Sequence, residues 1–303
     1  MAINRAQTKK QLQEGLNAVF GLEYKQYPEL WKDIFEMSKE SKKAYVEDVL
    51  MSGFGAAPVK AEGSGVQYDS ASEGYVSRYV FETIALAFAL TEEAGEDNLY
   101  GDLGSRLSKA LARSFQYTKN VKGANIANYA FTAGYTGGDG KVLCASDHPL
   151  QGGGTASNVL TTAADLSETA IEDLLIQIGD AVDDRGLPIP LMTKKLILPT
   201  ELQFTGNRLL KSDGRVGTAD NDINNIKAMN LISGGMAVNV YLTDPDAWFI
   251  TTDCMDGLKY IERKAISKGI EGEFESGNMR YKARERYVFG WSNWRGIYGT
   301  PGS

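Results

Sequence analysis

The strongest constraint on the fold is a long stretch of helical periodicity between Asp97 and Thr132. The apolar side chains at four-residue spacing in this stretch are Leu99, Leu103, Leu107, Leu111 and Phe115. Residues four apart lie on one face of an α-helix, so this spacing predicts one long helix, with Gly123 as the candidate position for a bend. Unbroken, it would be roughly 50 Å long at about 1.5 Å per residue, which favours a flat and extended subunit.

Length and composition indicate a globular chain of one or two domains without membrane spans. The 303 residues are enough to bury a sizeable core, and 43% of them are hydrophobic and 23% charged. No run approaches the roughly 18 apolar residues that cross a bilayer, and the N-terminus lacks the apolar stretch of a secretory signal. Two cysteines give no disulfide framework, so we expect folding in a reducing compartment.

The charge balance argues against broad nucleic-acid binding. The net charge is -7 and the isoelectric point is about 5.0, whereas binding to phosphates requires a basic stripe. Basic clusters occur at Lys39 to Lys43 and at Arg280 to Arg286, but acidic residues interrupt both. We interpret them as solvated or subunit-facing surfaces.

The first 55 residues suggest an arm. Leu12, Leu16, Val19 and Phe20 have helical spacing, and an aromatic segment follows from Tyr24 to Phe35. Periodicity alone leaves two alternatives open: an arm that needs a partner's surface, or a helix packed on its own domain.

A two-stranded ribbon is predicted next. Two extended segments from Val66 onward flank a turn at Asp69 to Gly74, and the return strand alternates through Phe81. A hairpin with mixed polarity on both faces is only marginally stable alone in water. It must lie on its own domain or on a neighbouring molecule, and we favour the neighbour.

The C-terminal half mixes helices and short strands. Asp165 is the predicted cap of a helix that ends near Arg185, a buried strand covers Lys195 to Leu198, and a second helix begins at Thr200. Later strands alternate around the turn at Asp244 and Pro245 without a regular strand-helix-strand rhythm. This order predicts an α+β fold.

Catalytic signatures are weak. The only histidine, His148, lies in a glycine-rich loop near Cys144 and Asp147, and a zinc site usually needs three or four protein ligands. The GGDGKV run at 137 to 142 lacks the first glycine and the final serine or threonine of a phosphate loop. We therefore predict no catalytic residue, no cofactor and no metal, and interpret the loop as structural.

Several runs resemble the major capsid protein of tailed bacteriophages, of the Mu-like head-subunit kind. They are LCASDHPLQGGGTASNVL at 143 to 160, AADLSETAIEDLLIQIGDAVDDRGLPIPL at 163 to 191, LILPTELQFTGNRLLKS at 196 to 212, NDINNIK at 221 to 227, YLTDPDAWFI at 241 to 250 and FGWSNWRGIYG at 289 to 299. Their order and spacing carry the resemblance over most of residues 98 to 299.

The resemblance implies the fold shared by tailed-phage shells and encapsulins. It places an N-terminal arm at 1–55 and an extended hairpin loop at 56–85. A peripheral domain comprises 86–139 and 254–303 with a spine helix at 97–132, and an axial domain covers 140–253.

The implied function is structural: many copies assemble as pentamers and hexamers into the icosahedral head that encloses double-stranded DNA. The implied partners are scaffolding, portal and decoration proteins, without sequence-specific DNA binding and without a membrane. The implied location is the virion shell, assembled in the cytoplasm of a host bacterium. On this basis we expect Phe20, Trp31, Tyr75, Tyr79 and Phe81 to lie at or near an intersubunit surface.

Three alternatives remain open from the sequence. An encapsulin-like nanocompartment would share the fold and enclose protein cargo instead of DNA. A metal-dependent hydrolase would use Cys144, Asp147 and His148. A phage tail or decoration subunit is disfavoured by the long predicted helix and the long axial region.

Overall fold

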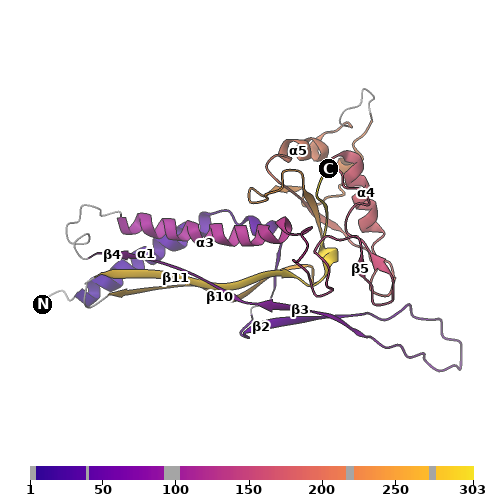
Figure 1. Cartoon of the computed structure of the whole chain (residues 1–303), viewed down its shortest axis with the longest axis horizontal. Helices are drawn as coiled ribbons and strands as arrows, with labels where there is room; N and C mark the ends of the chain where they lie inside the picture. The colour runs from indigo at the N-terminus through magenta and orange to yellow at the C-terminus, as the bar shows by residue number, and fades with distance from the viewer. Residues whose placement is uncertain (1–4, 39–40, 92–102, 216–221, 273–277) are drawn as a thin grey trace.

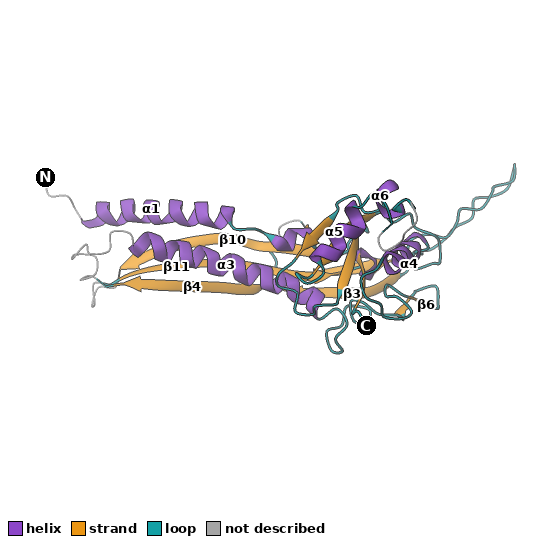
Figure 2. Cartoon of the chain, turned by 90° about the horizontal axis from the view of Figure 1, so that it is seen from above, coloured by secondary structure: helices purple, strands orange, loops and turns teal. Residues whose placement is uncertain are grey.

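The subunit has a long body with a second unit at one end (Figure 1). The computed structural model describes residues 5–38, 41–91, 103–215, 222–272 and 278–303. The body is a four-stranded sheet in the order β1-β10-β11-β4, with helices α1 and α3 along one face (Figure 2). Its elements are α1 (Arg5–Gln26), β1 (Glu36–Met37), β4 (Glu82–Leu90), α3 (Leu103–Asn128), β10 (Leu258–Gly272) and β11 (Met279–Trp291), with the short 3-10 helix η1 (Leu30–Asp33) after α1.

Strand β11 separates two kinds of side chain by strict alternation. Tyr281, Ala283, Glu285 and Tyr287 are buried on the face that carries the helices. The residues between them are basic and point to the other face: Arg280, Lys282, Arg284 and Arg286. Successive side chains of a strand point to opposite faces, so the basic cluster of the sequence becomes a row of cations on the outer face of the sheet.

The predicted long helix is present as α3. Residues 97–102 lie outside the described part, and the helix ends at Asn128 rather than at Thr132. Gly123 does not interrupt it. A Cβ atom at Gly123 would lie 2.9 Å from the Cβ of Trp31, so the glycine instead lets the Trp31 side chain approach the helix closely.

The N-terminal segment follows the second of the two alternatives left open by the sequence. Leu16 and Phe20 of α1 are buried against Leu111 and Phe115 of α3 in one apolar cluster. The α1 helix therefore packs on its own subunit.

The second unit, here called the end unit, combines a sheet in the order β12-β9-β7-β8 with three helices. Its elements are α4 (Glu168–Gly179), β7 (Thr193–Leu198), α5 (Gln203–Lys211), α6 (Asn225–Ala228), β8 (Met236–Val238), β9 (Trp248–Thr252) and β12 (Ile297–Thr300). Strand β7 confirms the buried strand predicted at Lys195 to Leu198, and the mixed architecture confirms the α+β prediction.

Three local predictions in the end unit were wrong. Helix α4 ends at Gly179, not near Arg185. Ser167, not Asp165, caps α4 by accepting from the backbone N–H of Ala170, and Asp165 instead accepts from Ser303. The C-terminal strand β12 pairs with β9 of the end unit rather than returning to the body. Its apolar residues Ile297 and Tyr298 are both buried there, which accounts for its position.

The two-stranded ribbon exists, but its first strand was misplaced. Strand β3 (Glu73–Val80) pairs antiparallel with β2 (Tyr45–Met51), not with a segment beginning at Val66. Residues 52–72 form the connection between them. We call β2, this connecting loop and β3 the hairpin; it starts before the predicted boundary at residue 56.

Candidate functional site

The hairpin projects beyond the rest of the subunit (Figure 1). Ser52 and Ser72 close the base of the connecting loop through backbone and hydroxyl hydrogen bonds. The loop beyond them exposes large apolar side chains, with Val59 100% and Tyr68 95% accessible. Exposed apolar side chains do not stabilise an isolated subunit, so this loop is the first candidate for contact with another molecule.

Three of the aromatic residues predicted at an intersubunit surface lie in or beside the hairpin. Tyr79 is buried with its hydroxyl hydrogen bonded to Ser292, and Phe81 is buried in a cluster with Ile261. Tyr75 is half-buried. The contacts of Tyr79 and Phe81 hold the hairpin to the outer face of the sheet.

The other two predicted residues lie in the body. Phe20 packs edge-on against Phe115, and Trp31 packs against the rings of Tyr260 and Phe289. Both are buried. Whether any of the five also contributes to a contact with a neighbour stays a prediction.

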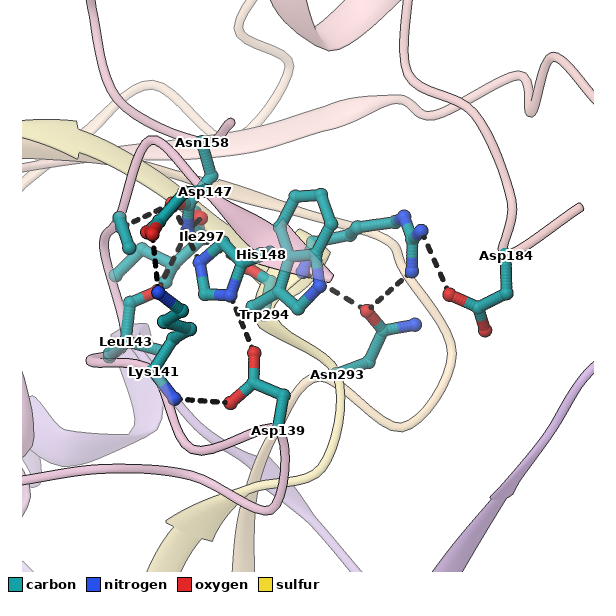
Figure 3. A network of polar contacts seen from close by, with 12 residues as sticks. Asp139, Lys141, Leu143, Asp147, His148, Asn158, Asp184, Asn293, Trp294 and Ile297 are labelled. Carbon is teal, nitrogen blue, oxygen red and sulfur yellow. Dashed lines mark hydrogen bonds and ion pairs between the residues drawn. The ribbon is translucent and has the colours of Figure 1, made fainter. Parts of the chain in front are cut away.

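A buried polar network lies where the hairpin, the body and the end unit meet (Figure 3). Its centre is His148 of β5 (His148–Pro149), which is 0% exposed and pairs through β5 with β6 (Thr155–Ala156). The imidazole Nδ1 lies 2.6 Å from Asp139 Oδ2, and Nε2 lies 3.2 Å from Asn158 Oδ1. The ring stacks on Trp294 with centroids 4.4 Å apart and planes 4° apart.

Asn158 connects three chain segments. Its amide nitrogen donates to the carbonyl oxygens of Leu143, Trp294 and Ile297, and its Oδ1 accepts from the backbone N–H of Ala145 at 2.9 Å. The side chain is completely buried. It therefore clamps the glycine-rich loop to the connection between β11 and β12.

A buried ion pair continues the network on the other side of Trp294. The Arg295 guanidinium lies over the indole ring, 4.3 Å from its centroid, and donates to Asp184 Oδ1 at 3.1 Å. Asp184 also accepts, through its carbonyl, from the backbone N–H of Gly152. The other terminal nitrogen of Arg295 donates to Asn293 Oδ1 at 3.4 Å, so stacking and two hydrogen-bond partners hold the guanidinium in position.

Arg185, the residue after Asp184, contacts the connecting loop of the hairpin. Its guanidinium contacts both carboxylate oxygens of Asp69, at 3.2 and 3.3 Å, and donates to the carbonyl of Ser70. The backbone N–H of Gly55 and the Arg185 guanidinium hold the pKa of Asp69 below its usual value. Neighbouring residues 184 and 185 thus connect the end unit to both the network and the hairpin loop.

The three residues of the hydrolase alternative have separate environments. Cys144 is buried, and burial raises the pKa of its thiol. Asp147 is at the surface in an ion pair with Lys141, which lowers the pKa of the Asp147 carboxyl. Within the described ranges, no group of three His, Cys, Asp or Glu side chains is placed to hold a metal ion.

A second buried ion pair, which sequence reasoning missed, fixes α1 to α3 and β11. Lys119 of α3 lies 2.9 Å from Glu285 of β11 and donates to the Tyr24 hydroxyl of α1 at 2.6 Å. Tyr24 in turn donates to Glu285 Oε2 at 3.0 Å. Burial raises the pKa of Glu285, and the Lys119 ammonium opposes the rise. In the sequence, the residues around Lys119, Tyr24 and Glu285 form no pattern that indicates contact among these three side chains.

Comparisons with known proteins agree on one family and one fold. A family profile described as phage capsid protein matches residues 74–300. A search of curated proteins found no match. None of the described helices is long and apolar enough to cross a membrane.

Three solved structures illustrate the shared fold. The capsid of the native GTA particle has a TM-score of 0.57 at 12% identity, over 89% of each chain. The capsid of Myoviridae phage XM1 has a TM-score of 0.53 at 7% identity, over 90% of each chain. The SrpI encapsulin of Synechococcus elongatus has a TM-score of 0.52 at 8% identity, over 92% of this chain and 89% of that one.

Proposed function

We propose, from the premise that this chain belongs to the phage capsid protein family, that its hairpin joins neighbouring copies in an icosahedral phage head. The chain is a structural subunit of a capsid shell and not an enzyme. The hydrolase alternative is therefore withdrawn. The observation that carries the proposal is the projecting hairpin with a loop of exposed apolar side chains.

The apolar loop side chains would gain stability only from another copy. Phe54, Val59, Val66 and Tyr68 are all exposed in the single subunit. Burying apolar surface stabilises by about 25 cal/mol per Å², before the cost of ordering the loop is subtracted. Because every copy in a closed shell repeats the contact, a modest gain per subunit is multiplied over the assembly.

The five aromatic residues named from the sequence remain proposed neighbours of this interface. Side chains buried in their own subunit have little surface left for a partner, so Phe20, Trp31, Tyr79 and Phe81 would act by fixing α1 and the hairpin in place. Tyr75 is the most accessible of the five. The direct contacts would come from the loop and from exposed side chains of the hairpin strands, such as Val76 and Val80.

The finer assignments are part of the same proposal. Copies would occupy pentamer and hexamer positions, with scaffolding, portal and decoration proteins as further partners, and assembly would take place in the bacterial cytoplasm. The net charge of -7 suits a container that encloses double-stranded DNA without binding it tightly. An encapsulin-like shell with protein cargo is the second candidate, since an encapsulin shares the fold.

Replacing Val59 and Tyr68 with aspartate is expected to give a folded subunit that forms no shells. Both side chains are almost fully exposed, so their loss leaves the intrachain core intact but places charges in the proposed contact. Circular dichroism would confirm folding, and negative-stain microscopy with size-exclusion chromatography would measure assembly.

The matched control is the pair Val59→Leu and Tyr68→Phe, which keeps the apolar surface and should still assemble. Normal shells from the aspartate variant would refute the role of the loop. Extraction of the particle contents from infected cells would separate the two candidates, because duplex DNA indicates a phage head and a protein cargo indicates a nanocompartment.

A further inference from the structure

The hydrogen bonds around His148 determine which of its ring nitrogens carry protons. Asn158 must direct its amide nitrogen toward three carbonyl oxygens and its Oδ1 toward the backbone N–H of Ala145. Rotating the amide by 180° would oppose oxygen to oxygen and N–H to N–H at every one of these contacts. Asn158 therefore offers only an acceptor to His148, and Nε2 must donate.

The other ring nitrogen faces a carboxylate. Asp139 Oδ2 lies 2.6 Å from Nδ1, and Asp139 Oδ1 already accepts from the backbone N–H of Lys141 at 3.1 Å. An ionised carboxylate only accepts, so Nδ1 must donate as well. A ring that donates from both nitrogens is an imidazolium cation.

The pair of Asp139 and His148 lies between the hairpin and the end unit. Asp139 belongs to a tight turn bridged by Thr136 and Val142, and Gly138 of that turn lies directly against Tyr75 and Ser77 of β3. On the other side, the chain after Asn158 bridges to Gly299 of β12 through Val159. The Asp139 to His148 contact thus joins strand β3 of the hairpin to the end unit.

We propose that His148 is held as the imidazolium and that its ion pair with Asp139 is a pH-sensitive clasp between strand β3 of the hairpin and the end unit. Stacking on Trp294 supports the cation, because an indole face attracts positive charge. Loss of the proton would bring an unprotonated ring nitrogen against an acceptor oxygen, either Asp139 Oδ2 or Asn158 Oδ1, inside a buried network.

The charged groups around the ring come from every neighbouring segment. Asp139 and Lys141 lie on the turn, Asp147 precedes His148, and Arg295 with Asp184 lies beyond Trp294. From the hairpin, Tyr75 faces Asp139, and burial raises the pKa of its hydroxyl, so it stays neutral. Three of these groups are carboxylates (Asp139, Asp147 and Asp184) and two are permanent cations (Lys141 and Arg295). An imidazolium at His148 supplies the third positive charge.

The sign of the pH effect follows from proton binding. On this proposal, a rise in pH from 6 to 8 favours the unfolded chain, because an ordinary histidine releases its proton above pH ~6.5. The stability from the clasp should therefore decline as the pH rises across this range.

Nuclear magnetic resonance can test the protonation state directly, because His148 is the only histidine in the chain. Selective ¹⁵N labelling of histidine in the full-length protein gives one ring. At pH 7 we expect two similar nitrogen shifts, the signature of imidazolium. Two widely separated shifts, which mark a neutral tautomer, would overturn the proposal. The measurement reads the same in subunits and in shells, so its outcome is independent of the assembly proposal.

Variants test whether the proton acts through the clasp. Between pH 6 and 8 the wild-type melting temperature should fall by about 2–4 °C more than that of Asp139→Asn or His148→Phe, the size expected for one buried hydrogen bond. The matched control is Asp147→Asn, which removes the adjacent exposed carboxylate and should keep the wild-type slope. Equal slopes in all four proteins would also overturn the proposal.

Discussion

Replacing Asn158 with leucine is expected to destabilise the subunit by about 4 kcal/mol or more, enough to prevent accumulation of folded protein. Leucine has a similar volume, so the loss comes from hydrogen bonds rather than from a cavity. It would remove the side-chain hydrogen bonds to three carbonyl oxygens, to the Ala145 N–H and to the His148 ring in a buried site. Each unsatisfied buried group costs about 1–3 kcal/mol, and the terms are not fully additive.

Urea unfolding of the dissociated subunit would measure this effect, with soluble yield as the first indicator. Asn128→Leu is the matched control, since Asn128 is only half-buried and bonds to a single neighbouring segment, at Tyr241 and Thr243. We expect it to cost about 1–2 kcal/mol. If the two leucine variants were equally stable, Asn158 would not be the clamp described above.

Replacing Lys119 with methionine is expected to cost about 3–5 kcal/mol, because it leaves the Glu285 carboxylate buried without its cation. The side chains of Lys119 and Glu285 are only 5% and 2% exposed. Removing both charges, with Lys119→Met and Glu285→Leu together, should recover most of the loss, since apolar packing often replaces a buried pair at little cost. Denaturant unfolding of the dissociated variants would give both values.

The pH dependence of the Lys119→Met variant provides a further check. Its Glu285 must be protonated to stay buried, whereas the carboxyl of the unfolded chain ionises above pH ~4.3. The penalty should therefore be small near pH 4 and increase as the pH rises toward 8. Lys122→Met is the control on the same helix: its pair with Glu82 is 35% and 59% exposed, and its loss should cost less than about 1 kcal/mol. If Lys119→Met and Lys122→Met lowered the free energy of unfolding by similar amounts, the assignment of Lys119 and Glu285 as a stabilising buried pair would be wrong.

Local sequence patterns predicted the elements whose apolar residues repeat along one segment. The four-residue spacing that continues to Phe115 gave α3, and the apolar run at Lys195 to Leu198 gave β7. In each case one face or one short run is buried, and the period of the pattern reports that burial. The motif succession from residue 143 onward indicated a phage capsid protein, which the match over 74–300 confirms. The Mu-like subtype stays a prediction.

Patterns in one segment could not show which other segment covers it. The strand alternation at Tyr75 to Phe81 was correct, but its partner is Tyr45 to Met51, separated by 21 intervening residues that carry no strand of their own. For the same reason, aromatic residues could be predicted as buried but not as buried within this chain. Phe20 and Trp31 illustrate this, since their partners lie across the body.

The two buried polar networks, one around Asn158 and one around Lys119, were the least predictable part of the structure. Asn158 bonds to backbone atoms as far as 139 positions away, and backbone acceptors have no sequence signature. Lys119, Tyr24 and Glu285 come from three separate elements and resemble ordinary surface residues in the sequence. The lone histidine did draw attention to its loop, but its function there depends on Asp139 and Asn158, whose orientation only the fold determines.

The alternation along β11 limits how this region can change in length during evolution. A single inserted or deleted residue would reverse every side chain beyond it, moving arginines under the helices and Tyr281 into water. Substitutions among the outer cations leave this register unchanged. Length variants of the strand in related phages should therefore differ by two residues at a time, or place the change outside the strand.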